Sequence, residues 1–206
     1  MSKGLLLVGA GGHARSCIEV IESAGLRVFG LVDRDTSMLG GDVFGYPVLG
    51  SDAELVRLAK ESDGVLVTVG QIGRPKARVT LYETLVLNGI VPVNVSASTA
   101  RVSPRASVGR GGVVMHQVVV NAGARVGVNC IVNTGAIIEH DAEIGDHCHV
   151  AIGAVVGGGV RIGACSFLGA GAIISHGVSI GPGSIIGAGC VVMSDCAAET
   201  FMKRSA

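Results

Sequence analysis

The most regular feature of the chain is an aliphatic residue at every sixth position. From Val102 to Val192, sixteen consecutive positions spaced six apart hold Val, Ile or Leu, and a small residue such as Ala124 or Cys130 stands two places before most of them. Neither an α-helix nor an alternating strand has this period. A period of six is typical of the hexapeptide repeat of a parallel β-helix, in which each hexad forms one short strand and one turn. Three hexads complete a coil, so the pattern predicts about five coils.

The residues before the repeat follow a different pattern, in which short apolar runs alternate with helical spacing. Cys17, Ile18 and Ile21 fall on one face of a helix that ends before Gly25. Alternation of strand and helix is typical of a small, Rossmann-like parallel α/β domain. The expected strands cover residues 4–8, 28–32 and 64–69, and the expected helices cover residues 13–24, 53–59 and 76–87. We therefore predict an α/β domain over residues 1–97, an all-β parallel β-helix over residues 98–195 and a tail over residues 196–206.

The repeat also predicts where cysteines and glycines lie. Residues 18 apart stack in successive coils, so we expect Cys130 and Cys148 one above the other inside the β-helix, with Cys190 also in its core. Glycines that directly follow the aliphatic position are expected in turns with positive φ, which glycine adopts at no steric cost. Asn121 and Asn133 stand at the same position of their hexads. The glycines concerned are Gly109, Gly127, Gly145, Gly163, Gly169, Gly181 and Gly187.

The composition of the chain argues against several classes of function. Lys plus Arg and Asp plus Glu number 16 each, so the chain has no basic surplus for binding nucleic acid or acidic lipid. The chain contains no run of 18 apolar residues, so we expect no membrane-spanning helix. The first apolar run is too short for a secretion signal. The six cysteines form no C-x-x-C pair and no zinc-binding spacing. We therefore expect reduced thiols, no metal site and a cytoplasmic protein.

A glycine-rich turn follows the first expected strand. Gly9, Gly11 and Ala14 fit the pattern G-x-G-x-x-A, and Asp33 follows about twenty residues later. Such a turn can close on phosphate oxygens at a helix N-terminus. A nicotinamide dinucleotide would need a second mononucleotide half, which the chain lacks, so a mononucleotide or nucleotide-sugar fits better. A tight turn without a ligand, with Asp33 as a strand-end residue and His13 as a cap, remains the alternative.

Histidines supply the candidate chemistry of the repeat region. Five of the six histidines lie there, and a histidine is the simplest general base near neutral pH. His140 stands between Glu139 and Asp141, and either carboxylate could fix its tautomer and raise its basicity. His116, His147 and His176 are expected to be surface residues.

Together these motifs resemble a known family. The G-A-G-G-H turn and the run Asn133-Thr-Gly-Ala-Ile-Ile-Glu-His-Asp141 resemble sugar acetyltransferases of the left-handed β-helix superfamily, over residues 4–193. This group includes nucleotide-linked amino-sugar N-acetyltransferases and sialic-acid O-acetyltransferase-like proteins. The resemblance implies a left-handed β-helix, a homotrimer, and acetyl-CoA bound between neighbouring β-helices.

The resemblance also implies roles for individual residues. His140 matches the family's base, and Asp141 matches the carboxylate that raises its basicity, although we would expect Glu there. His149 matches a histidine that contacts acetyl-CoA near the thioester. Small residues matching the strip along pantetheine and adenine are Gly158, Ala170 and Ala188. Residues matching the nucleotide-sugar contacts are Gly11, Gly12, His13, Asp33, Arg34 and Gly70, and Asn133 of the motif is also assigned to the substrate.

We therefore expect an acetyl-CoA-dependent N-acetyltransferase that acts on a nucleotide-linked amino sugar by direct attack, in the synthesis of cell-surface glycan precursors. O-acetylation of a sialic acid is the second enzymatic alternative, and a non-catalytic trimeric nucleotide-sugar-binding protein is the third. Apolar residues beside the repeat position predict that the trimer buries at least one wall of the β-helix. They are Val113, Val119, Ile131, Ile137, Ile173 and Ile185. The chain also lacks the family's G-x-P-A-K-like ending.

Overall fold

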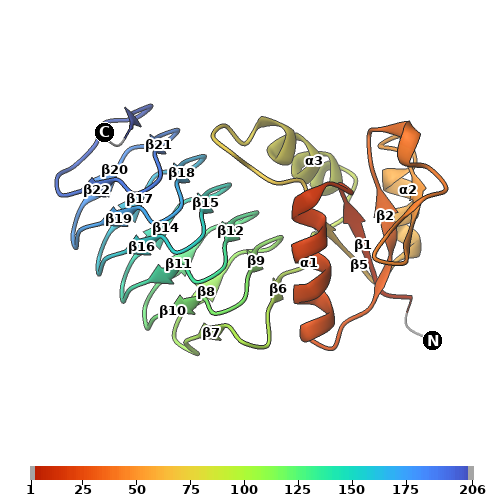
Figure 1. The fold of residues 1–206 in the computed structure, drawn as a ribbon, viewed down its shortest axis with the longest axis horizontal. Helices are drawn as coiled ribbons and strands as arrows, with labels where there is room; N and C mark the ends of the chain where they lie inside the picture. Colours follow the sequence, from red (N-terminus) through yellow and green to blue (C-terminus); the bar gives the residue numbers. More distant parts are fainter. Residues whose placement is uncertain (1–2, 204–206) are drawn as a thin grey trace.

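The computed structural model describes residues 3–203 and contains an α/β unit followed by a β-helix. Figure 1 shows the α/β unit at the first coils of the β-helix, whose coils stack away from it toward the C-terminus. Both parts of the predicted fold class are confirmed. Within residues 3–203, no helix combines the length and the apolar character needed to cross a membrane.

The α/β unit is a five-stranded sheet with the order β3-β4-β2-β1-β5. All its strand pairs are parallel except that of β3 with β4. Three of these strands, β1, β2 and β5, and all three helices agree with the sequence-based prediction, whereas the hairpin of β3 and β4 was not predicted. The strands are β1 (Leu5–Val8), β2 (Val28–Val32), β3 (Asp42–Val43), β4 (Tyr46–Gly50) and β5 (Gly64–Val67). The helices are α1 (Gly12–Ser23), α2 (Leu55–Glu61) and α3 (Lys76–Leu87), and residues Thr36–Met38 form a 3₁₀ turn.

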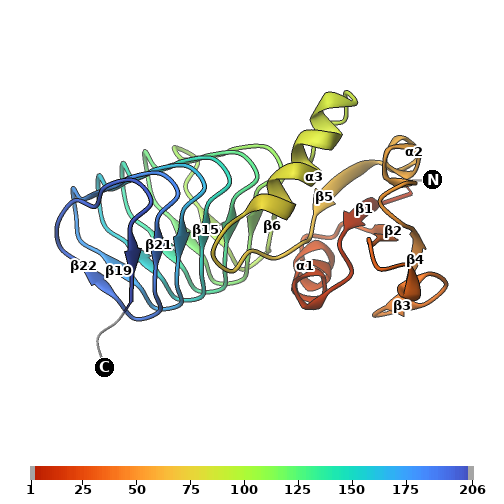
Figure 2. The ribbon, with the colours of Figure 1, turned by 90° about the horizontal axis from the view of Figure 1, so that it is seen from above.

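Strand β1 is buried on both faces, as expected for a central parallel strand. Leu5 and Leu7 belong to the apolar cluster that contains the buried face of α1, whereas Leu6 and Val8 belong to the cluster with α2 and α3. Helix α1 lies on the side of the sheet that faces the β-helix, and α2 lies on the far side (Figures 1 and 2). The face occupied by α1 is therefore the one that joins the two parts of the chain.

Three walls of parallel two-residue strands form the β-helix. We name them by what their outer faces carry: the docking wall, the apolar wall and the charged wall. The docking wall consists of β6 (Val95–Ser96), β9 (Val113–Val114), β12 (Ile131–Val132), β15 (His149–Val150), β18 (Phe167–Leu168), β21 (Ile185–Ile186) and β23 (Phe201–Met202). The apolar wall consists of β7 (Arg101–Val102), β10 (Val119–Val120), β13 (Ile137–Ile138), β16 (Val155–Val156), β19 (Ile173–Ile174) and β22 (Val191–Val192). The charged wall consists of β8 (Ser107–Val108), β11 (Arg125–Val126), β14 (Glu143–Ile144), β17 (Arg161–Ile162) and β20 (Ser179–Ile180).

The register of the coils explains the period of six. Strands pair with residues 18 positions away, as Ile131 does with His149, and the aliphatic residue of most hexads is buried inside. Cys130, Cys148 and Cys190 are buried there as predicted. The thiols of Cys130 and Cys148 donate to the carbonyl oxygens of Gly145 and Gly163, each at 3.2 Å. These small inward residues therefore fill the core and also hydrogen-bond the backbone of the neighbouring turn.

The prediction for the turn glycines is wrong in one respect. Positive φ falls two places later, at the third residue after the aliphatic position, for example at Gly135 (67°) and Asp141 (59°). Gly109 and its equivalents are needed for a different reason, the close approach of the next coil. A Cβ at Gly109 would lie 2.6 Å from the backbone carbonyl carbon of Gly127. The stacking of coils, rather than the local turn, therefore selects glycine at that position.

Part of the segment predicted as a tail extends the β-helix. Cys196 forms a bridge with Ile180, and Phe201–Met202 pair in parallel with β21. The last coil thereby covers edge backbone groups that would otherwise lack partners. Residues 204–206 lie outside the described residues, so the predicted division at residues 97 and 195 stays a prediction.

The α/β unit covers the outer face of the docking wall at its first coils. Val113 and Ile131, outward residues of that wall, are fully buried and belong to the same apolar cluster as the inner face of α1. Their expected role in subunit contacts is therefore wrong, because the chain itself covers them. Val119, Ile137 and Ile173 lie on the apolar wall and remain candidates.

Arg78 of α3 joins the two units. Its fully buried guanidinium donates to the carbonyl oxygens of Val67 (2.6 Å) and Val69 (3.0 Å) in the α/β unit. It also donates to Asn129 (3.2 Å) and Gly111 (3.4 Å) in the β-helix. Burial lowers the pKa of this guanidinium to about 10. Arg78 thus remains a cation at neutral pH and is held by carbonyl dipoles of both units.

Candidate active site

His140 lies at the corner where the chain passes from the apolar wall to the charged wall, two residues after the end of β13. Its side chain is exposed, and its Nδ1 lies 3.0 Å from a carboxylate oxygen of Asp141. The backbone N–H of His140 donates to Glu139 at 3.2 Å. A carboxylate can only accept a hydrogen bond, so Nδ1 carries the proton and Nε2 keeps a free lone pair. This arrangement is that of an oriented general base.

The carboxylates also set the basicity of His140. The hydrogen bond that His140 donates to Asp141 raises the pKa of His140 above its ordinary value, and the charges of Asp141 and Glu139 act in the same direction. Gly158 is the equivalent residue in the next coil, and a Cβ there would lie 2.6 Å from Nε2 of His140. Glycine at this position therefore leaves room for the imidazole. His176, two coils on from His140 at the same corner, is exposed as predicted.

His149 lies in different surroundings. It points outward from β15 on the docking wall, yet it is buried, because the loop before α3 covers it. Its Nδ1–H donates to the carbonyl oxygen of Gln71 at 2.5 Å, and its Nε2 accepts from the side-chain amide of Asn133 at 3.1 Å. Burial lowers its pKa to about 4, and the charge of Arg78 adds to this effect. His149 is therefore neutral at physiological pH, with both ring nitrogens engaged inside the chain.

His13 lies at the same junction, in the first turn of α1. Burial lowers its pKa to about 3, and the charges of Arg78 and His149 lower it further. Among the residues that the structure describes, its Nε2 is buried without a hydrogen-bond partner. A Cβ at Gly70 would lie 3.2 Å from the Cβ of His13, so these two predicted substrate residues are neighbours. The junction thus brings His13 and Gly70 of the α/β unit toward His149 and Asn133 of the β-helix.

Asp33 holds the glycine-rich turn. One carboxylate oxygen accepts the backbone N–H of Ala10 at 2.7 Å, and the other accepts that of Asp35 at 2.9 Å. Asp33 therefore has a structural role whether or not it also binds a ligand. Gly11, Gly12 and Arg34 are exposed, and no atom lies within 4 Å of a Cβ added at either glycine. The turn consequently leaves backbone groups open at the start of α1.

The predicted site residues do not form one cluster within the chain. His140, Asp141, Glu139 and Gly158 lie at the corner between the apolar and charged walls. Ala170 and Ala188 each lie two residues after a strand of the docking wall, β18 and β21. They are therefore at the corner between the docking and apolar walls. Within one chain the apolar wall therefore separates Gly158 from Ala170 and Ala188, and the assignment of these three residues to acetyl-CoA stays a prediction.

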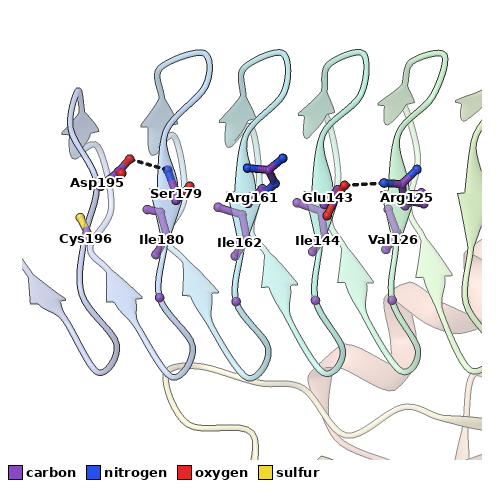
Figure 3. Close-up of a pocket in the computed structure, with 14 residues that line it drawn as sticks. Arg125, Val126, Glu143, Ile144, Arg161, Ile162, Ser179, Ile180, Asp195 and Cys196 are labelled. Carbon is purple, nitrogen blue, oxygen red and sulfur yellow. Dashed lines mark hydrogen bonds and ion pairs between the residues drawn. The ribbon is translucent and has the colours of Figure 1, made fainter.

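A surface cavity does not coincide with either cluster. It has a volume of about 540 Å³ and lies on the outer face of the charged wall, where Figure 3 shows its side chains. Arg125 forms an ion pair with Glu143, and Asp195 accepts the backbone N–H of Ser179 at 2.8 Å. These groups satisfy one another, and none of the predicted site residues lines the cavity.

Two residues at the junction escaped the sequence analysis. His147 is a contact residue rather than a surface residue, because its ring packs edge-on against Tyr82 at 5.5 Å and lies 3.0 Å from the side-chain amide of Asn129. In the sequence nothing distinguishes Arg78 from an ordinary arginine of a helix. Its role as the central cation of the junction is seen only in the structure, where its guanidinium contacts turns of the β-helix.

The β-helix with an outward histidine–carboxylate pair defines the class as a hexapeptide-repeat acyltransferase. Residues 4–85 match the PglD N-terminal domain, and residues 141–176 and 159–194 match the bacterial transferase hexapeptide (six repeats). No significant match was found among curated proteins.

Solved structures similar to this chain indicate a narrower class than the family models do. Perosamine N-acetyltransferase from Caulobacter crescentus, solved with CoA and GDP-perosamine, is 35% identical over 96% of this chain and 92% of its own, with a TM-score of 0.89. The acetyltransferase domain of PglB from Neisseria gonorrhoeae, solved with acetyl coenzyme A, is 32% identical over 96% and 94%, with a TM-score of 0.87. WeeI from Acinetobacter baumannii, 23% identical over 96% and 94% with a TM-score of 0.83, supports the fold alone.

The chain belongs to the left-handed β-helix sugar acetyltransferases. This confirms the predicted resemblance and the predicted enzyme class, an acetyl-CoA-dependent sugar acetyltransferase. The roles of individual site residues stay predictions.

Proposed function

We propose that this protein transfers the acetyl group of acetyl-CoA to the amino group of a nucleotide-linked amino sugar, in the synthesis of a cell-surface glycan precursor. The observation that carries this proposal is the exposed His140, whose Nδ1 is held by Asp141 and whose Nε2 is free. The similarity to an enzyme solved with CoA and GDP-perosamine supports the choice of substrate class.

The proposed reaction is direct. The sugar amine attacks the thioester carbonyl carbon, a C–N bond forms, and the C–S bond breaks as CoA thiolate leaves. His140 Nε2 accepts the proton that the attacking nitrogen loses, and the thiolate takes up a proton to give free CoA. The Asp141 carboxylate stabilises the imidazolium that forms. A covalent acetyl-cysteine is not part of the proposal, because Cys148 is buried and its thiol donates to a backbone carbonyl.

The substrate sites are proposed to lie on both sides of the junction. Gly11 and Gly12 offer open backbone at the start of α1 for the phosphates of the sugar nucleotide, with His13, Asp33, Arg34 and Gly70 around them. Asn133 is assigned to the substrate and His149 to the acetyl-CoA site, and the hydrogen bond between the Asn133 amide and His149 Nε2 holds these two residues side by side. Gly158, Ala170 and Ala188 provide backbone along the two corners for the rest of acetyl-CoA.

A homotrimer is proposed because the apolar wall needs a cover. Outward residues of this wall are aliphatic in five successive coils, and the last two are 43% and 56% exposed. These residues are Val119, Ile137, Val155, Ile173 and Val191. Burying such a wall between subunits is favourable. It would bring the His140 corner of one subunit to the docking-wall corner of the next and so join the two clusters.

The remaining elements of the proposal concern the chain as a whole. Its division into a nucleotide-sugar-binding domain (residues 1–97), an acyltransferase domain (98–195) and a tail (196–206) follows the change of pattern in the sequence. The six cysteines are all free thiols, which supports a reducing, cytoplasmic environment.

Release of CoA thiol from acetyl-CoA tests the function. Purified protein is offered nucleotide-linked amino sugars, a sialic acid, or no acceptor. Release with an amino sugar supports the proposal, release with the sialic acid alone would favour O-acetylation, and binding without release would favour a non-catalytic protein.

The variant His140→Ala tests the base. It should lower kcat about 10²–10⁴-fold while leaving the unfolding transition unchanged, because the side chain is exposed. His176→Ala is the matched control, since His176 is exposed at the same corner two coils away. Equal kcat values for His140→Ala and wild type would exclude His140 as the base.

A further inference from the structure

The carboxylate of Asp141 has a second neighbour besides His140. Oδ2 lies 3.0 Å from Nδ1 of His140, and Oδ1 lies over the Cα of Gly123 in the preceding coil. A Cβ at Gly123 would overlap Oδ1 of Asp141 and would lie 3.2 Å from its Cγ. The carboxylate thus reaches His140 by folding back onto a residue that has no side chain.

Backbone conformation alone does not require glycine at this position. Gly123 has φ of 77°, but equivalent turn positions hold Gln117, Asn129 and Asp141 with φ of 59°, 54° and 59°. The β-helix therefore accepts side chains in this conformation. The distinguishing property of Gly123 is the space that the Asp141 carboxylate occupies.

Gly177 provides the comparison within the same corner. It lies three coils on from Gly123 and has φ of 70°, yet no atom lies within 4 Å of a Cβ added there. Alanine at either position meets the same backbone strain, whereas only alanine at Gly123 displaces a carboxylate. The atom displaced is the end of a side chain, so the fold can accommodate the change.

We infer that Gly123 is a positioning residue for proton transfer. Because Gly123 has no Cβ, the Asp141 carboxylate can lie against its Cα, and from there this short side chain can hold Nδ1 of His140. The inference rests on the proposed function of His140 as the base. Glycine at 123 thereby determines the tautomer and the orientation of the imidazole, although it does not touch the reacting atoms.

A histidine titration tests this directly. Protein labelled with ¹³C at histidine Cε1 is titrated by NMR as wild type, Gly123→Ala and Gly177→Ala. In Gly123→Ala the pKa of His140 should fall toward the ordinary value for histidine, because the Asp141 hydrogen bond that raises it is lost. Glu139, the other charged group that raises this pKa, is unchanged in both variants. In Gly177→Ala the pKa of His140 should equal that of wild type.

Kinetics provide the second measurement. The acidic limb of the kcat/KM profile for acetyl transfer should move to lower pH in Gly123→Ala, and kcat should fall by at least about tenfold, since misplacing a catalytic group by about 1 Å costs up to about 10²-fold. Gly177→Ala should retain the wild-type profile. In an Asp141→Asn background, Gly123→Ala should have no further effect on kcat, because the group that it displaces no longer holds His140.

The outcomes separate this inference from the proposed function. The titration needs no substrate, so a fall in the His140 pKa in Gly123→Ala supports the positioning role even if no acetyl transfer is found. An unchanged His140 pKa in Gly123→Ala overturns it, even if the enzyme is active. If Gly123→Ala fails to fold, Gly123→Asn serves instead, because asparagine tolerates positive φ and also places a Cβ against the carboxylate.

Discussion

Acid should weaken the junction between the α/β unit and the β-helix, because two neutral histidines are buried there. Folding lowers the pKa of His13 to about 3 and that of His149 to about 4, against 6.5 for the ordinary side chain. Between pH 6.5 and about 4 the unfolded chain therefore binds more protons than the folded protein. Stability consequently falls as the pH falls through this window.

The size of this loss of stability follows from the two pKa values. At pH 5 both side chains are almost fully protonated in the unfolded chain and almost neutral in the folded protein. Each then lowers the free energy of unfolding by about 2 kcal/mol relative to pH 8, or about 4 kcal/mol together. This is a large share of the roughly 5–15 kcal/mol that stabilises a typical domain. His147, half-buried beside Tyr82, shifts in the same direction.

Urea denaturation followed by far-UV circular dichroism at pH 8, 7, 6 and 5, at constant ionic strength, measures this loss. The double variant His13→Gln/His149→Gln should lose about 4 kcal/mol less than wild type between pH 8 and 5, and each single variant about half of that. His176→Ala, which removes an exposed histidine, should follow the wild-type curve. A wild-type free energy of unfolding that stays constant from pH 8 to 5 would refute the reasoning, as would an equal loss in the double variant.

Two further predictions concern the interfaces. Ile173→Glu, which places a charge on the apolar wall, should convert the proposed trimer to monomers in sedimentation velocity and abolish acetyl transfer. Arg161→Glu on the charged wall should leave the oligomeric state of wild type unchanged, and a monomeric wild type would exclude the proposed assembly. Arg78→Met should lower the free energy of unfolding by about 3 kcal/mol, because carbonyl oxygens of both units lose a charged donor. Arg78→Lys should recover only part of this free energy, because the lysine ammonium is a compact charge that cannot donate like the planar guanidinium. Wild-type stability in Arg78→Met would contradict the assigned role of Arg78.

The β-helix could be predicted because its rule is local and repeated. Each hexad from Val102 onward meets nearly the same surroundings, so one aliphatic residue must point inward in every turn of the pattern. Strands β1, β2 and β5 and the three helices of the α/β unit follow in the same way from short apolar periods. The β3–β4 hairpin was missed because β3 has only two residues, and because β4 contains Pro47 and a single buried aliphatic residue, Val48.

The His140–Asp141 pair could also be predicted, since its partners are adjacent in the chain. The resemblance to sugar acetyltransferases then supplied a role for each. What sequence could not supply was the space that lets the pair form, because Gly123 and Gly158 reach it only through the stacking of coils 18 residues apart.

Only the tertiary structure decided the character of the junction. His149 and Val113 occupy outward positions by their period, yet they are buried because the α/β unit docks on that wall. The contacts responsible join residues far apart in the chain, such as Gln71 with His149 and Arg78 with Asn129. Burial and pKa depend on what covers a residue in space. A periodic pattern records which way each side chain points, but the pattern is the same whether water or another part of the chain lies beyond it.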